Sequence, residues 1–444
     1  MTVATANIRT AAETALIEAF DDVKTALPGG SERLFAREAA FGAIRANGLP
    51  NRRVEAYKYT DLKALYGRQA PVDGAIAGAG SAAALPPDTW SGVDRSVIAF
   101  ENGRALMPAG SASLPEGVVC APYLEAAEAT GFAGDYPAAN GDPILALNGA
   151  FTTDGVALTI GAASSEPVVE ILHLSTASAP ADTVATHRIR VETGVKATVL
   201  VTYLSDGEPV TRENVAFEVD VERDAELTFV SRQQHAESVT HFATLRAGLG
   251  ERAKLDLFNL CMGAGQSRQQ NFIGFFGETA SVVQRTISLV GDGQQADVVH
   301  AIDHRLMNCD SKDFHRVVAD GRGRSVYQGL ITVRPDAQHT DGRMMTKSLL
   351  LSDEAEAIAK PELEIFADDV QCAHGATSGQ LDETQIFYLM SRGIGRREAE
   401  HLLLSAFLNE VIEDFGEGAI ADNLLSAVDD WLERRWSLNE EAAA

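Results

Sequence analysis

A motif that recurs at nearly constant spacing between Val156 and Ile365 constrains the fold of this chain more than any other feature. Each β-rich run opens with charged or glycine turn residues, continues with a small residue and then alternates its side chains. The small residues are Ala197, Ala225, Ala253, Ala280, Ala296, Ser325 and Ala355, and the successive differences between their positions are 28, 28, 27, 16, 29 and 30. Repeats of this size predict a solenoid in which each coil buries its apolar face against its neighbours, that is, a β-helix. A β-sandwich of regular hairpins is the alternative.

The segments on either side of the repeats have a different character. Residues 1–70 show apolar side chains at helical spacing, and residues 71–155 combine a linker rich in Ala, Gly and Pro (70–86) with a mixed α/β region. Residues 156–380 form the predicted β-helix core, and apolar stripes after Leu381 predict a C-terminal helical domain over 381–444. We therefore expect a mainly β protein with helical regions at both ends.

The charge balance excludes several classes of partner. The 444-residue chain has 37 basic and 63 acidic residues and a net charge of -26. Nucleic-acid binding and attraction to anionic membranes both depend on clustered Lys and Arg, so neither is expected. We find no signal peptide and no apolar run long enough to span a bilayer, and we predict a cytoplasmic protein. The four cysteines match no iron-sulfur ligand pattern and are expected to be reduced thiols.

Most familiar catalytic motifs are missing from the sequence. There is no Gly-x-x-x-x-Gly-Lys-Ser/Thr loop, no Gly-x-Ser-x-Gly elbow and no His-Glu-x-x-His. This excludes ATP binding through a P-loop and the simplest hydrolase and zinc-protease interpretations. The densest polar cluster, between His300 and His339, fits no ligand spacing, and we expect it to form solvated faces and turns.

Cys372 and His374 are the strongest candidates for function. They follow a strand-like segment and precede a helix, and in an extended strand residues two apart point to the same face. A thiol and an imidazole could then meet one metal or one partner. Spacing alone favours ordinary core packing over a metal site, because closed metal sites use about four ligands.

The sequence resembles the SufB/SufD family, the scaffold subunits of the SUF iron-sulfur cluster assembly system. An N-terminal element from Val54 to Thr60 is similar to the family's Glu-x-Trp-Lys-Tyr-Thr element, and Cys-x-His-Gly resembles the SufD branch. The core motifs are Gln338-x-Thr340-Asp341, Leu349-Leu-Leu-Ser352, Pro361-Glu-Leu-Glu-Ile365, Asp368-Asp-Val370, His374-Gly-Ala-Thr377 and Phe387-Tyr-Leu-Met-Ser-Arg-Gly-Ile394.

This resemblance implies a non-catalytic scaffold with a right-handed parallel β-helix. It implies pairing with SufB through the β-helix and docking of the ATPase SufC on the C-terminal helices, with Tyr388, Arg392, Gly393 and Phe407 as docking candidates. ATPase activity then belongs to the partner.

The resemblance also implies that a nascent cluster forms at the SufB-SufD interface. His374 is the principal interface residue and a transient iron ligand, and Cys372 is the secondary candidate. No tightly bound cofactor is expected, only a transient iron-sulfur cluster shared with SufB.

Three positions depart from the family pattern, and two other functions stay open. Tyr57 replaces Trp, Ala373 replaces Ser, and Met344 stands where Gln is common. Carboxylates on a solenoid wall could instead serve a stand-alone carbohydrate-active enzyme. The chain could also be a metal-carrying homodimer, and expressed alone it could pair with a second copy through an open sheet edge.

Overall fold

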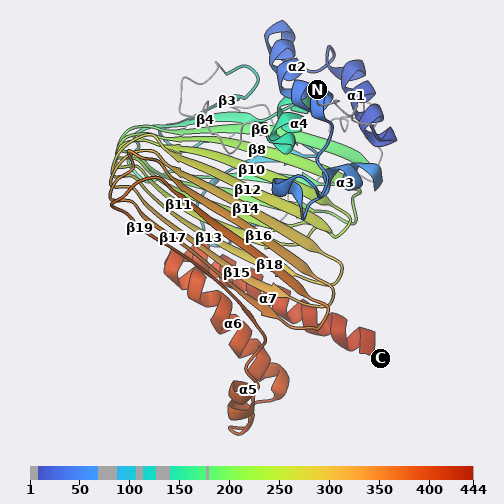
Figure 1. Ribbon diagram of the computed structural model, residues 1–444, viewed down its shortest axis with the longest axis vertical. Helices are drawn as coiled ribbons and strands as arrows, with labels where there is room; N and C mark the ends of the chain where they lie inside the picture. The colour runs from blue at the N-terminus through green and yellow to red at the C-terminus, as the bar shows by residue number, and fades with distance from the viewer. Residues whose placement is uncertain (1–8, 69–87, 107–113, 127–140, 177–179, 444) are drawn as a thin grey trace, which may run out of the picture.

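The computed structural model describes residues 9–68, 88–106, 114–126, 141–176 and 180–443. A long solenoid of stacked strands forms its body, with the N-terminal helices against one side and the C-terminal helices against another (Figure 1). The helices are α1 (Ala11–Val23), α2 (Gly30–Asn47), the short 3-10 helix η1 (Glu55–Tyr57), α3 (Leu62–Arg68), α4 (Pro143–Phe151), α5 (Glu383–Met390), α6 (Arg396–Phe415) and α7 (Ala419–Ala443). The predicted linker at 70–86 lies outside the described residues. None of the described helices has an apolar stretch that could cross a membrane.

Two sheets build the solenoid. Sheet A contains, in spatial order, β18 (Glu356–Ile365), β16 (Arg324–Val333), β14 (Gln295–His304), β12 (Gln266–Phe275), β10 (Thr240–Leu249), β8 (Thr211–Val221), β6 (Ala181–Val191), β4 (Val156–Ile160) and β3 (Val118–Pro122). Sheet B contains β19 (Gln371–Gly379), β17 (Asp341–Leu350), β15 (Asp310–Ala319), β13 (Ser281–Val290), β11 (Lys254–Met262), β9 (Glu226–Gln234), β7 (Lys196–Ser205), β5 (Val168–Ser175), β1 (Ser96–Glu101) and β2 (Arg104–Ala105).

The strand order confirms the predicted parallel β-solenoid with helices at both ends. From β4 to β19 the chain alternates between the two sheets, and each strand pairs in parallel with the strand one coil away. The strands of a hairpin-built sandwich would pair antiparallel with their sequence neighbours. Among the described strands only β1–β2 and β3–β4 pair antiparallel, so the sandwich is excluded.

The strand register corrects the predicted repeat. Successive strands of sheet B are offset by nearly equal steps along the chain, as shown by the pairs Lys196↔Glu226, Glu226↔Lys254, Lys254↔Ser281, Ser281↔Asp310, Asp310↔Asp341 and Asp341↔Gln371. Ala225, Ala253 and Ala280 therefore stand opposite one another in successive coils and form one column. In the coil before them this column contains Val195, not Ala197 as the repeat predicted. Ala296 and Ser325 lie in sheet A. The short step from Ala280 to Ala296 is thus a crossing between sheets and not a short coil.

Turn geometry explains why a small residue follows polar ones in each repeat. The residues before Val195, Ala225, Ala253, Ala280, Cys309 and Thr340 of this column have a positive φ, namely Gly194 (74°), Asp224 (57°), Arg252 (55°), Thr279 (60°), Asn308 (61°) and His339 (61°). This left-handed residue reverses the chain sharply into sheet B, and the next side chain points into the narrow edge of the interior. Ala225 and Ala253 are fully buried there. Small side chains fit that space.

Helices cover part of the outer face of each sheet. The N-terminal helices pack on sheet A, where the buried Arg268 of β12 pairs with Asp297 and lies 4.4 Å from the ring of Tyr57. The C-terminal helices pack on sheet B, with Leu404 and Leu408 of α6 in one apolar cluster with strand residues such as Phe258 and Leu260. Each sheet therefore buries an inner face against the other sheet and part of its outer face against helices.

Candidate functional site

The two strands of the last coil, β18 and β19, form an open end. Each is the edge strand of its sheet and pairs on one side only, with β16 and β17 respectively. Most of their side chains are exposed or half-buried, in contrast to the buried strands of the middle coils. Unpaired strand edges are ready to pair with another chain. This end of the solenoid is therefore suited to docking.

Cys372 and His374 lie on β19 at this open end. In the register they stand opposite Gly342 and Met344 of β17, so both belong to columns that face the solenoid interior in earlier coils. Cys372 is half-buried and packs against the core, whereas His374 is exposed. The structure thus places both predicted residues on one face of an edge strand.

The surroundings give the two groups different chemical states. Burial raises the pKa of the Cys372 thiol, with a further rise from the nearby Asp341 and an opposing backbone hydrogen bond from Gly342. Since the thiolate is the form that binds metal, Cys372 needs a cation or a partner group to ionise at neutral pH. Met344, which is 2 % exposed, offers no polar support beside the pair. His374 is the more accessible side chain of the two.

The candidate docking residues differ in exposure to solvent. Tyr388 is 57 % exposed, and the guanidinium of Arg392 donates a hydrogen bond to its hydroxyl at 3.0 Å. Gly393 has a φ of 88° in the turn between α5 and α6, a conformation that suits glycine. Phe407 instead packs partly against the solenoid, with the guanidinium of Arg316 5.5 Å from its ring.

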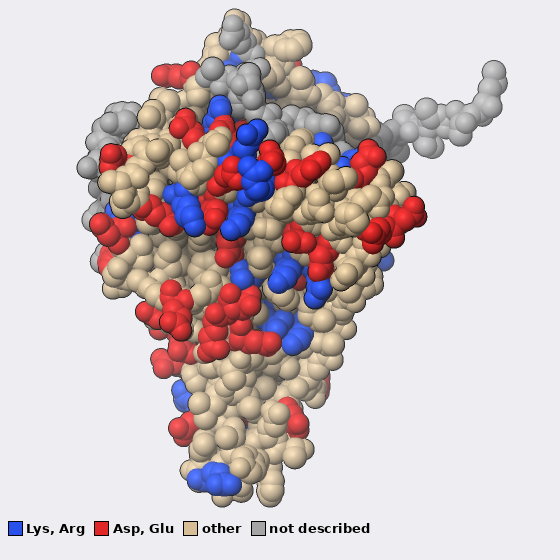
Figure 2. Space-filling model, turned by 90° about the vertical axis from the view of Figure 1, so that its left-hand side faces the viewer, with Lys and Arg blue, Asp and Glu red and all other residues tan. Residues whose placement is uncertain are grey.

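Three other exposed apolar side chains lie on α5 and α6. They are Phe387, 72 % exposed, Met390, and Leu402 of α6. Helix α5 projects from the body of the molecule (Figure 1), and Figure 2 shows that this narrow end has few charged side chains compared with the turns above it. We refer to Phe387, Tyr388, Met390 and Leu402 as the α5 patch. Exposed apolar side chains gathered on a projecting helix and its neighbour are typical of a site of protein interaction.

The polar cluster between His300 and His339 is mostly buried, so our expectation of solvated faces is wrong for most of it. His300 lies 2.9 Å from the carboxylate of Asp313, which also accepts a hydrogen bond from Tyr327 at 2.7 Å. Within the cluster, Asp310 and His339 are exposed, as expected. The expectation failed for the others because alternate residues of these strands face the solenoid interior, where polar groups pair with one another.

A second interior cluster lies near the start of the solenoid and carries no motif that drew attention in the sequence. Glu213 accepts from His241 Nδ1 at 3.0 Å, and His235 Nε2 lies 3.3 Å from the same carboxylate. His173 Nδ1 is 3.9 Å away. Burial lowers the pKa of His173 and His241 to about 3 and that of His235 to about 4, so these imidazoles are neutral at pH 7.

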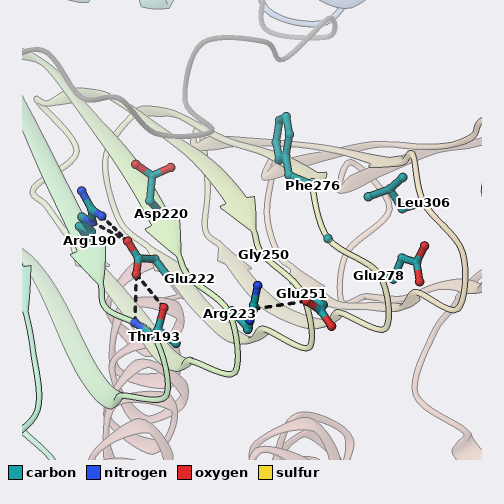
Figure 3. Close-up of a pocket in the computed structure, with 11 residues that line it drawn as sticks. Arg190, Thr193, Asp220, Glu222, Arg223, Gly250, Glu251, Phe276, Glu278 and Leu306 are labelled. Carbon is teal, nitrogen blue, oxygen red and sulfur yellow. Dashed lines mark hydrogen bonds and ion pairs between the residues drawn. The ribbon is translucent and has the colours of Figure 1, made fainter.

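A surface cleft of about 860 Å³ runs along the row of turns that lead from sheet A to sheet B (Figure 3). Several of its charged side chains form ion pairs or hydrogen bonds: Glu222 pairs with Arg190 and accepts hydrogen bonds from Thr193, and Arg223 lies 3.3 Å from Glu251. Cys372 and His374 do not line it. The cleft is therefore separate from the candidate site.

The fold and the open end define a class: a two-sheet parallel β-solenoid with helical ends that presents a thiol and an imidazole on an edge strand. Two family descriptions match the sequence. "SUF system FeS cluster assembly, SufBD core domain" matches residues 173–407, and "SufBD protein N-terminal region" matches residues 10–76. The core match covers more than half of the chain, and the chain belongs to the SufBD family of the SUF iron-sulfur cluster assembly system.

Three relatives illustrate the degree of similarity. The chain is 30% identical to the iron-sulfur cluster assembly protein SufD of Escherichia coli over 242 residues, which cover 54% of this chain and 57% of the relative. It is 28% identical over 215 residues to an iron-sulfur cluster assembly SufBD family protein of Synechocystis, with 48% of each chain covered. Protein ABCI7 of the Arabidopsis thaliana chloroplast is 30% identical over 210 residues, 47% of this chain and 44% of the relative. The matches thus span about half the length of these relatives.

Proposed function

We propose that the chain is a non-catalytic scaffold subunit for iron-sulfur cluster assembly, and that it pairs with SufB through the open end of its solenoid. The observation behind this proposal is that an exposed imidazole and a half-buried thiol share one face of an edge strand with an unpaired side. Pairing at that edge would bring a second chain directly against His374.

The number of ligands supports an interface site. Iron-sulfur clusters are typically held by four protein ligands, whereas Cys372 and His374 supply at most two. The remaining ligands must then come from another subunit. A transient cluster shared across the interface also agrees with a thiol whose pKa is raised by burial, because such a thiol ionises only when iron or a partner group approaches.

The α5 patch supports docking of the ATPase SufC. Its apolar side chains are exposed, and α5 stands away from the solenoid, so a partner can reach it. We place Tyr388, Arg392 and Gly393 at this dock, whereas Phe407 supports α6 on the solenoid. ATP hydrolysis would then occur in the partner, in keeping with a sequence that lacks a P-loop.

The carbohydrate-enzyme alternative finds little support. The buried carboxylate of Asp313 is engaged by His300 and Tyr327, and Asp303 forms an ion pair with Arg334. A glycosidase needs two carboxylates on either side of an open sugar site. A homodimer through the open end uses the same surface as the SufB pairing, so its metal content and partner preference decide between the two.

The test is cluster reconstitution with the three-subunit complex. We expect His374→Ala to lower cluster yield at least tenfold while the subunits still assemble, because the imidazole ligand is lost and the strand edge is kept. Thr377→Ala, an exposed change on the same strand, should leave the yield intact. His374→Cys should restore part of the yield, since a thiol can replace the ligand. An unchanged yield with His374→Ala would refute the site.

A further inference from the structure

The solenoid brings three metal-binding side chains together in its interior, far apart in sequence but adjacent in the fold. Glu213 of β8 and His241 of β10 stand directly opposite each other in the parallel register. His235 follows the last residue of β9 and begins the turn that leads into β10. All three side chains are buried, with at most 4 % of their surface exposed. The cluster exists only when these neighbouring strands are in register.

We propose that Glu213, His235 and His241 bind one divalent transition-metal ion, zinc or iron(II), inside the solenoid. Their donor atoms all lie within 4.8 Å of one another. The separations from the carboxylate are 3.0 Å to His241 Nδ1 and 3.3 Å to His235 Nε2. Ligands with bonds of about 2.0–2.1 Å stand about 3.0–3.4 Å apart around a tetrahedral or octahedral ion. Both separations from the carboxylate therefore suit ligands of one ion.

The charge of the cluster favours a cation. In the part of the chain that the structure describes, the ion-pair partners of Glu213 are histidines, and no Lys or Arg reaches it. A carboxylate removed from water is costly without a compensating charge. A divalent ion between the carboxylate and neutral imidazoles supplies that charge.

Unused donor atoms point into the same place. His173 Nδ1, 3.9 Å from the other oxygen of Glu213, is buried and has no hydrogen-bond partner among the described residues. It is therefore available as a fourth ligand.

The donor set also selects the type of ion. Imidazole and carboxylate suit zinc and iron(II), and two histidines with one carboxylate form sites of both kinds. Because the ligands come from consecutive strands of two coils, binding would stabilise the start of the solenoid and depend on folding. This site is independent of the interface at Cys372 and His374, and either proposal can fail without the other.

The test uses the purified full chain without partners. After dialysis against a chelator, the chain is loaded with Zn²⁺, with Fe²⁺ without oxygen, or with Co²⁺, and bound metal is measured by mass spectrometry. We expect about one equivalent of zinc or iron per chain, a melting temperature that rises with metal concentration, and loss of at least tenfold in affinity in Glu213→Gln and His241→Gln. His315→Gln, another buried imidazole of the interior, should bind metal like the wild type.

The Co²⁺ spectrum of the wild type keeps the test valid even if the variants do not fold. Nitrogen and oxygen ligands give visible ligand-field bands without the intense thiolate charge-transfer band of a cysteine site. Binding of less than a tenth of an equivalent, or a thiolate band that shows the ion on a cysteine, would overturn the proposal. So would unchanged affinity in folded Glu213→Gln and His241→Gln.

Discussion

The two ends of the solenoid differ in burial, although the same repeating unit builds both. Ile160 of β4 and Ile365 of β18 occupy the same inward column of sheet A, which the register follows from coil to coil. Ile160 is fully buried, whereas Ile365 is 42 % exposed. The same position in the repeat therefore serves the core at one end and the surface at the other.

The first coil is closed by strands that interrupt the parallel pattern. β3 lies antiparallel on β4 and ends with Pro122, and the short β2 lies antiparallel on β1. Short strands and proline discourage further pairing at a sheet edge. At the other end β18 is long but has Pro361 in its middle, whereas β19 is long and has no proline. The comparison indicates that the edge of the first coil is blocked against further pairing, and that β19 is the strand of the last coil whose edge lacks such a block.

The largest expected effect on stability tests this comparison directly. Ile160→Ala should lower the free energy of unfolding by about 2–5 kcal/mol, because it leaves a cavity in a closed core. Ile365→Ala, the matched change at the open end, should cost less than about 1 kcal/mol. Urea unfolding of both variants measures the difference. Equal losses would show that the open end is as tightly packed as the closed one.

The pH dependence of stability tests whether water is excluded from the interior near the open end. Burial lowers the pKa of His304 and His315 from 6.5 to about 3. The unfolded chain then binds more protons between these values, so stability is full above pH 6.5 and falls as the pH decreases toward 3. Each imidazole contributes up to about 1.4 kcal/mol per pH unit.

Urea unfolding between pH 7.5 and 5 should show this loss, with a shallower slope in His315→Gln than in the wild type. If water reached the interior through the open end, these imidazoles would titrate near their ordinary value. The wild type and His315→Gln would then have the same slope.

A smaller effect on stability, with a large effect on binding, is expected at the α5 patch. Phe387→Ala should change the free energy of unfolding by no more than about 0.5 kcal/mol, because the ring lies in solvent. It should weaken ATPase binding by about 1–3 kcal/mol if Phe387 anchors the partner. Calorimetric titration measures this, with the exposed Glu417→Ala in the α6–α7 loop as a control. Full affinity in Phe387→Ala would place the dock elsewhere.

Much of the fold could be predicted from local sequence. The alternation of turn residue, small residue and strand reflects the left-handed turns at positions such as Asp224 and Arg252, so the repeat predicted a solenoid correctly. The exact register could not be predicted, because similar turns occur on both sheets and the series passes from Ala280 in one to Ala296 in the other.

The side-chain clusters inside the solenoid were not predicted from the sequence. Glu213 and His241 are separated by one coil of the chain, and that spacing could have identified them once the repeat was known. The pairing of His235 with them depends on a turn that folds its side chain inward. The burial of His300 and Asp313 was missed because polar residues on alternating strands were assumed to face water.

Hydrogen exchange of the chain alone and in complex with SufB tests the central claim most directly. If the open end is the partner-binding end, amides of β18 and β19 should exchange rapidly in the isolated chain and slow at least tenfold in the complex, while β2 and β3 stay unchanged. Protection that appears at β2 and β3, or no change at β18 and β19 in a formed complex, would contradict the account.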